Sequence, residues 1–118
     1  MAHMGAGGMR AVAEVSVQRA HHLANLLTSI DGLSLANPST PFLWEFVVRT
    51  PRSAASFART LRERGIVAGL PLGYFDAQRD NELLVCCTEL TSPQAIDRYA
   101  AAAANVVASE PAVAMARA

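Results

Sequence analysis

The chain has 118 residues, of which 52% are hydrophobic, and its ten basic and ten acidic side chains give a formal net charge of +0. This length fits one domain, and the hydrophobic content can bury a core, which excludes disorder as the default. Because the charge is balanced, we expect neither nucleic acid nor an anionic membrane as a partner. No apolar run reaches the roughly 18 residues of a membrane span.

All ten basic residues are arginine, and the chain contains no lysine. A Schiff base with a cofactor aldehyde needs a lysine amine, so none can form within this chain. The two cysteines, Cys86 and Cys87, are adjacent and can close only a strained ring. A reduced, cytoplasmic setting is therefore the expected localisation.

Three regions are expected along the chain. Residues 1–9 lack the features of a signal peptide, and we interpret them as a disordered leader or a vector-derived remnant. A single α+β domain is predicted over residues 10–108, followed by a frayed tail over 109–118. The domain opens with a helix from about Arg10 to Ser29, because apolar residues recur there at steps of three and four.

Two strands are predicted next. Leu33 to Leu35 is expected to be short, and the stretch "FLWEFVVRT" (42–50) has the clearest two-residue period of the chain. Its predicted core face carries Phe42, Trp44, Phe46 and Val48. Its other face is mixed and contains Glu45 and Arg49.

A second helix is expected to begin after Ser53, a candidate N-cap, and to end at Gly65, which has the position of a C′ glycine. Residues 66–68 are expected to open a third strand. The segment from Gly69 to Asn81 is rich in turn residues and is predicted to be mostly loop.

The last predicted strand is "ELLVCC" (82–87), and the last helix runs from about Pro93 to Ala108 with Ser92 as its N-cap. The mixed order of short strands and helices favours an α+β fold, in which a small, mostly antiparallel sheet has helices packed on one face.

The stretch "RERGIVAGLPLGYF" places Gly65, Gly69 and Gly73 four residues apart, with Pro71 between the last two. A phosphate-binding loop needs its glycines directly before a helix. Here Gly65 follows a helix and precedes a strand, so a helix cap and turns are the simpler interpretation. Adjacent His21 and His22 point about 100° apart on a helix, and no metal site is expected from them.

Four stretches in order carry a family resemblance: "GMRAVAEVSVQRAHHLANLL", "PFLWEFVVRTP", "LRERGIVAGLPLGYF" and "NELLVCCTELTSPQAIDRYAAA". From about Met9 to Val107, the chain resembles glycine dehydrogenase (decarboxylating) subunit 1, the first half of the P-protein of the glycine cleavage system. The resemblance implies the C-terminal small domain of a fold-type I pyridoxal-phosphate enzyme.

The resemblance also implies the partners of the parent complex, which decarboxylates glycine and passes the aminomethyl group to the lipoyl arm of the H-protein. They are a large pyridoxal-phosphate-type domain, a second P-protein subunit that carries the cofactor lysine, and the H-protein. The chain departs from the family at its "FNEF" asparagine, which is Leu43 or Trp44 here. It also has Leu83 and Leu84 where many relatives carry a substrate-clamping arginine.

We therefore expect a structural or interface domain with no activity of its own, and we predict no catalytic, cofactor-binding or metal-binding residue. The residues expected to face an interface or a substrate are Glu45, Gly69, Pro71, Gly73, Thr88 and Glu89. Two alternatives remain open. One is a free-standing α+β regulatory module that binds a small molecule at its glycine loop. The other is an assembly domain that forms a homodimer through the apolar stripe of its first helix.

Overall fold

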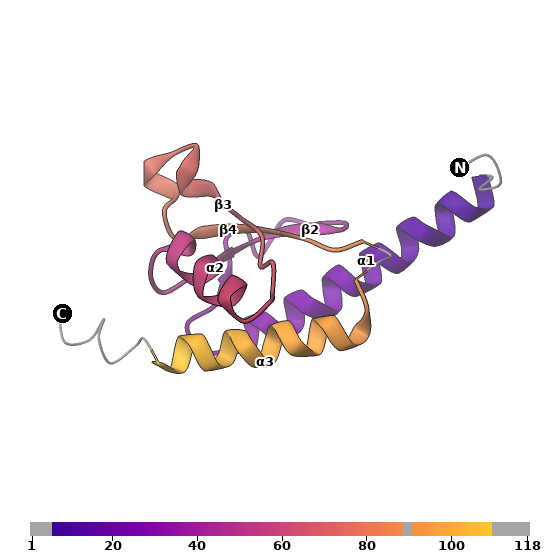
Figure 1. Ribbon diagram of the computed structural model, residues 1–118. Helices are drawn as coiled ribbons and strands as arrows, with labels where there is room; N and C mark the ends of the chain where they lie inside the picture. The colour runs from indigo at the N-terminus through magenta and orange to yellow at the C-terminus, as the bar shows by residue number, and fades with distance from the viewer. Residues whose placement is uncertain (1–5, 89–90, 110–118) are drawn as a thin grey trace.

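The computed structural model contains one four-stranded antiparallel sheet in the order β1-β2-β4-β3, with the helices on one face (Figure 1). It describes residues 6–88 and 91–109. The helices are α1 (Ala6–Thr28), α2 (Ala54–Glu63) and α3 (Pro93–Ser109), and two short 3-10 helices are η1 (Leu72–Tyr74) and η2 (Ala77–Arg79). The strands are β1 (Ser34–Leu35), β2 (Glu45–Arg49), β3 (Leu70–Pro71) and β4 (Glu82–Cys86).

This arrangement confirms the expected α+β fold class. Residues 1–5 of the expected leader and 110–118 of the expected tail lie outside the described residues, whereas residues 6–9 belong to α1 and residue 109 to α3. No helix within the described ranges is long and apolar enough to cross a membrane.

The local signals at the helix ends work as the sequence predicts. The Ser53 hydroxyl accepts a hydrogen bond from the Ser56 amide at 3.3 Å, and the Ser92 hydroxyl accepts one from the Ala95 amide at 3.0 Å. Each bond satisfies an amide that has no partner inside its helix. Gly65 follows the end of α2 with a φ of +82°, a conformation that glycine adopts without strain.

The core lies between the sheet and the three helices. Along β2 and β4, Phe46, Val48, Leu83 and Val85 are buried while their neighbours face the other side, as a two-residue period requires. The helices meet this face with a continuous apolar cluster that includes Leu27, Leu61, Ile96 and Val106.

The first strong strand is shorter than predicted. It begins at Glu45, and Leu43 and Trp44 form a bend before it. Phe42 is held by α1, because its ring stacks on the His21 ring with centroids 4.0 Å apart and its carbonyl oxygen lies 2.9 Å from His21 Nε2. The prediction that Trp44 faces the core is therefore wrong, since 42% of this residue is exposed.

The third strand also begins later than expected, at Leu70 instead of Ile66. Positive φ angles at Gly65 and Gly69 interrupt the extended backbone on either side of the predicted segment. Within it, the Ala68 carbonyl accepts a hydrogen bond from the Tyr99 hydroxyl at 2.8 Å. The helix α3 thus takes the group that a strand partner would otherwise bind.

Candidate functional site

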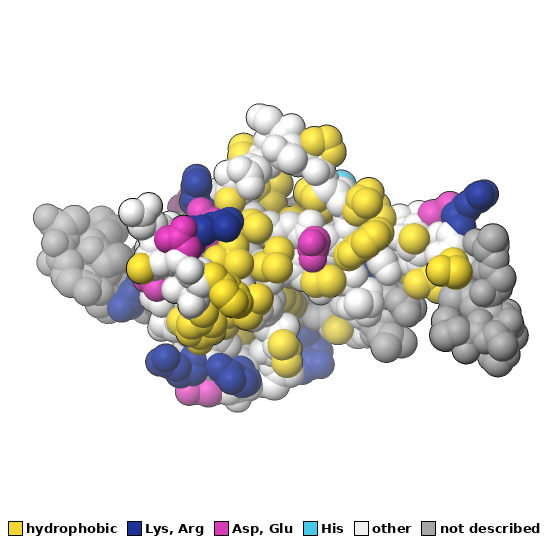
Figure 2. Space-filling model, turned by 90° about the horizontal axis from the view of Figure 1, so that it is seen from above, with side chains coloured by type: hydrophobic (Ala, Val, Ile, Leu, Met, Phe, Trp, Pro, Cys, Tyr) yellow, Lys and Arg dark blue, Asp and Glu magenta, His cyan; other side chains and the backbone are white. Residues whose placement is uncertain are grey.

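The face of the sheet opposite α1 and α3 has no element of the described chain packed across it. Figure 2 views this open face from above and shows hydrophobic side chains spread over it. Their central members are Val47 of β2, Leu84 of β4 and Leu70 of β3, because Leu84 is the register partner of both others. An apolar surface in this position is better suited to contact with another protein than to catalysis.

Charged groups lie at one end of the open face. Glu82 accepts a hydrogen bond from Arg79 Nε at 2.8 Å and lies 2.8 Å from Arg79 Nη2. Arg49 Nε is 3.8 Å from the other Glu82 oxygen. Arg49 therefore already has a carboxylate of the same chain beside it.

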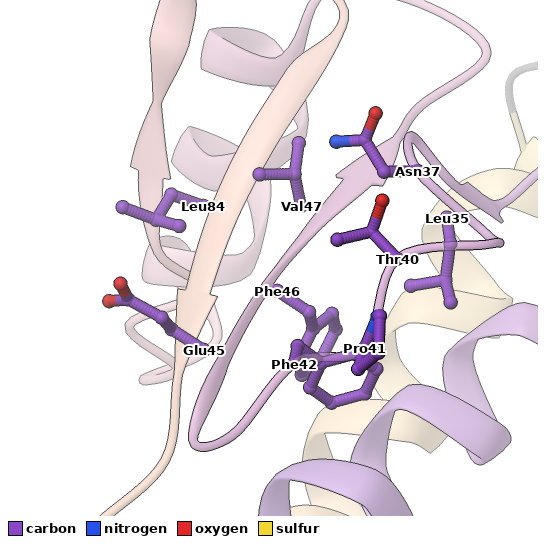
Figure 3. Close-up of a pocket in the computed structure, with 9 residues that line it drawn as sticks. All are labelled: Leu35, Asn37, Thr40, Pro41, Phe42, Glu45, Phe46, Val47 and Leu84. Carbon is purple, nitrogen blue, oxygen red and sulfur yellow. The ribbon is translucent and has the colours of Figure 1, made fainter.

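A small pocket of about 190 Å³ opens at the edge of this face, between β2 and the 37–42 loop (Figure 3). Its floor is apolar and includes Val47 and Leu84. The predicted residue Glu45 lies on the Leu84 side, while Asn37 and Thr40 lie on the other side. The pocket therefore separates its one carboxylate from its neutral polar groups.

A larger pocket of about 340 Å³ lies beside the glycine loop. It is lined by Ala58 and Arg62 of α2 and by Val67, Ala68, Gly69, Leu70, Pro71 and Tyr74. Two predicted residues, Gly69 and Pro71, thus share a pocket that does not contain Glu45. Gly73 lies outside the lining and packs against Asp80, whose Cα would be 3.0 Å from a Cβ on Gly73.

Gly69 has a packing role that the structure makes explicit. Its φ is +151°, and a Cβ at this position would lie 2.3 Å from the backbone oxygen of Leu84. Only a residue without a side chain permits this approach of the loop to β4. The geometry favours close backbone packing for this glycine over an anion cradle.

The last two predicted residues follow β4. Thr88 is exposed, and its amide donates a hydrogen bond to the Thr91 hydroxyl at 3.1 Å. Glu89 lies outside the described residues. The predicted set is therefore divided between two pockets and the turn after β4, and it forms no single site.

Sequence reasoning did not single out Arg62, Val67 or Tyr74, which the structure places around the larger pocket. Val67 is 87% exposed and Tyr74 is 66% exposed. The available signal was the presence of large apolar residues in a segment otherwise rich in turn residues. Turn segments are normally polar, so such residues indicate a contact surface.

The buried titratable groups are held in their neutral forms. Burial, with a smaller contribution from neighbouring Cys86, raises the pKa of Cys87 to about 11, while Arg19 opposes the shift. Burial also raises the pKa of Tyr99. A protonated, buried thiol is a poor nucleophile. Across residues 6–88 and 91–109, no three His, Cys, Asp or Glu side chains come close enough to hold a metal ion.

Comparison with known proteins identifies the relatives of this chain, although no family model matches it. It is 38% identical over 99 residues to a Dictyoglomus turgidum protein described as "probable glycine dehydrogenase (decarboxylating) subunit 1". It is 41% identical over 107 residues to the Methylococcus capsulatus protein of the same description. The chain is therefore similar in sequence to one segment of glycine dehydrogenase (decarboxylating) subunit 1.

The matches cover 84% and 91% of this chain but only 22% and 23% of those two relatives. A crystal structure of the glycine decarboxylase (P-protein) of the glycine cleavage system, in inhibitor-bound form, matches with a TM-score of 0.77 and 32% identity. The match covers 89% of this chain and 23% of that one. The chain thus spans less than a quarter of these relatives.

More distant structures share the fold alone. A C-DES mutant with glycine covalently linked to its PLP cofactor matches with a TM-score of 0.67 at 18% identity, covering 81% of this chain and 24% of that one. The residues of the present chain do not fit the attachment of such a cofactor, because the chain has no lysine and the centre of its open face is apolar.

Proposed function

We propose that this chain acts as the C-terminal small domain of a glycine dehydrogenase (decarboxylating) subunit 1, with a structural role. The observation that carries the proposal is the uncovered apolar face, with Val47, Leu70 and Leu84 at its centre. The relatives are more than four times as long as the matched segment, so they contain ample chain to cover this face. We assign that role to the large pyridoxal-phosphate-type domain.

On this proposal, glycine catabolism takes place in a cytoplasmic complex, and the cofactor lysine belongs to the second P-protein subunit. The lipoyl H-protein then accepts the aminomethyl group from that complex. This chain contributes the docking surface, and Glu45 and the glycine loop, including Gly73, face the covering domain. No activity is expected of the chain alone.

A binding experiment tests the docking role. The chain is mixed with the Methylococcus capsulatus relative lacking the matched segment, and complex formation is followed by size-exclusion chromatography. We expect a complex that Leu84→Glu abolishes and that Ala101→Glu, an exposed site on α3, leaves intact. Equal effects of the two variants contradict docking through the open face, and glycine decarboxylation by the chain alone contradicts its structural role.

A regulatory module is the second candidate, and the 340 Å³ pocket beside the glycine loop is the observation that favours it. A ligand that binds only the folded state raises the melting temperature. A thermal-shift screen with free amino acids and pyridoxal phosphate distinguishes the candidates. Stabilisation that Gly69 and Arg62 substitutions remove would favour the module over the structural domain.

Self-association of the isolated chain is also proposed, through the N-terminal half of α1. These turns extend past the rest of the domain (Figure 1). Beside them lies a mostly apolar groove of about 430 Å³, where Ala13 and Val17 face Leu43 and Trp44. Leu43 is 60% exposed. A second copy of the chain is the occupant that we assign to this groove.

A further inference from the structure

We propose that the larger pocket, beside the loop of residues 67–74, is a docking site for an acidic segment of another protein that carries one large apolar side chain. The inference concerns the chain without its covering domain, because the pocket shares Leu70 and the glycine loop with the surface that this domain is proposed to face. It combines the shape of the pocket, the charge around it and the rigidity of its walls.

The pocket can hold an apolar side chain. Its volume is about 340 Å³, and Ala58, Val67, Leu70 and Pro71 contribute apolar surface to its lining. Val67 and Tyr74 are mostly exposed at its rim, and Leu70 is 41% exposed. Protein interfaces gain most of their affinity from large side chains that fill such pockets.

The α2 wall of the pocket is basic although the chain as a whole is neutral. Arg62 lines the pocket, and Arg59 lies one helical turn before it on α2. Arg98 of α3 lies instead in a neighbouring pocket, which also contains Gly65.

Arg59 and Arg62 are available to a partner. Both are exposed, and neither forms an ion pair with another residue in the described ranges. The one acidic side chain of α2 is Glu63, so this helix keeps an excess of positive charge, while Asp76 and Asp80 lie in the chain after Tyr74. Arginine is enriched at interface hot spots because its guanidinium binds carboxylates with two parallel hydrogen bonds.

The pocket walls are fixed before any partner binds. The backbone of Gly69 packs against Leu84, and the Ala68 carbonyl is held by the Tyr99 hydroxyl at 2.8 Å. Pro71 is buried, and it pairs with Leu83 in the sheet. A preformed pocket costs little ordering entropy on binding.

A protein segment fits these features better than nucleic acid or a membrane. Nucleic acids are held mainly through phosphate contacts along an extended basic surface. Here one arginine, Arg62, lines an apolar hollow, and Arg59 lies one helical turn before it. In an acidic segment with one apolar anchor, the anchor would fill the pocket and the carboxylates would pair with the arginine side chains beside it.

The probe for this site is a fluorescein-labelled peptide of glutamates with one central tryptophan, and fluorescence anisotropy measures its affinity for the full chain at low ionic strength. We expect Arg62→Glu to weaken binding by at least about tenfold, and Tyr74→Ala to weaken it as well. The matched control, Arg10→Glu, makes the same charge change on α1 and should alter the affinity less than about twofold.

Two comparison probes and a fold check complete the test. A peptide with alanine in place of tryptophan should bind at least about tenfold more weakly, because it leaves the pocket empty. Circular dichroism verifies that each variant is folded. The proposal is overturned by no binding of the tryptophan peptide, by equal losses in Arg62→Glu and Arg10→Glu, or by tighter binding of an RNA oligonucleotide or of anionic vesicles.

Discussion

Gly69 joins the glycine loop to the sheet through its lack of a side chain. Its φ of +151° and the 2.3 Å that would separate an added Cβ from the Leu84 oxygen both oppose any larger residue. We expect Gly69→Ala to lower the free energy of unfolding by roughly 2–4 kcal/mol. Urea denaturation measures the change, and Gly7→Ala, which meets no atom within 4 Å, is the control that should not destabilise. A neutral Gly69→Ala would contradict the packing role.

Cys87 makes the free energy of unfolding depend on pH in the alkaline range. Its pKa is raised from 9.0 to about 11 by burial, so the folded state keeps its proton over a range in which the unfolded state loses it. The contribution of the protonated Cys87 to the free energy of unfolding is complete below pH 9, and it decreases as the pH rises towards 11. Cys87→Ala should flatten this fall in urea denaturation at pH 8–11, whereas Cys86→Ala, which removes an exposed thiol, should keep most of it. An unchanged fall in Cys87→Ala would refute the assignment.

Single-residue signals were the most predictable part of this fold. Ser53, Gly65 and Ser92 mark helix ends through local hydrogen bonds and backbone angles, so their roles can be seen in the sequence alone. The pocket around Arg62 and Tyr74 could not be predicted in this way. It depends on the packing of α2 against β3, which no local pattern encodes.

At the scale of an element, α2 shows how much a cap contributes. Four of its residues are buried in the core: Ala54, Phe57, Ala58 and Leu61. The Ser53 hydroxyl satisfies the Ser56 amide at its start. Ser53→Ala should therefore cost about 1 kcal/mol of stability, measured by thermal or urea unfolding. Ser34→Ala changes an exposed strand residue and should stay within about 0.5 kcal/mol; equal losses in the two variants would argue against the cap.

Strand boundaries were harder to predict than strand identity. The alternation in "FLWEFVVRT" continues through Phe42 and Trp44, yet β2 begins at Glu45 because Phe42 stacks on His21 of α1. Similarly, the apolar segment 66–68 contacts α3, through the hydrogen bond from Tyr99 to Ala68, instead of joining the sheet. In both places a contact with a distant helix overrides a local two-residue period.

At the scale of the whole molecule, two apolar surfaces are formed by different elements. The open face is built from β2, β3 and β4, and the relatives contain a further three quarters of chain that could cover it. The groove beside α1 instead includes exposed Leu43 and Trp44, which precede β2. The two surfaces can therefore serve different partners without competition.

The groove beside α1 leads to the last prediction, which concerns the mass of the isolated chain in solution. If a second copy fills the groove, light scattering at high protein concentration should give twice the monomer mass. Leu43→Glu should restore the monomer, because a charge in an apolar contact is costly to desolvate. Val67→Glu makes the same kind of change at an exposed residue of the other pocket and should leave the dimer intact. A monomer for the unmodified chain, or equal dissociation by both variants, would show that the groove does not pair with a second copy.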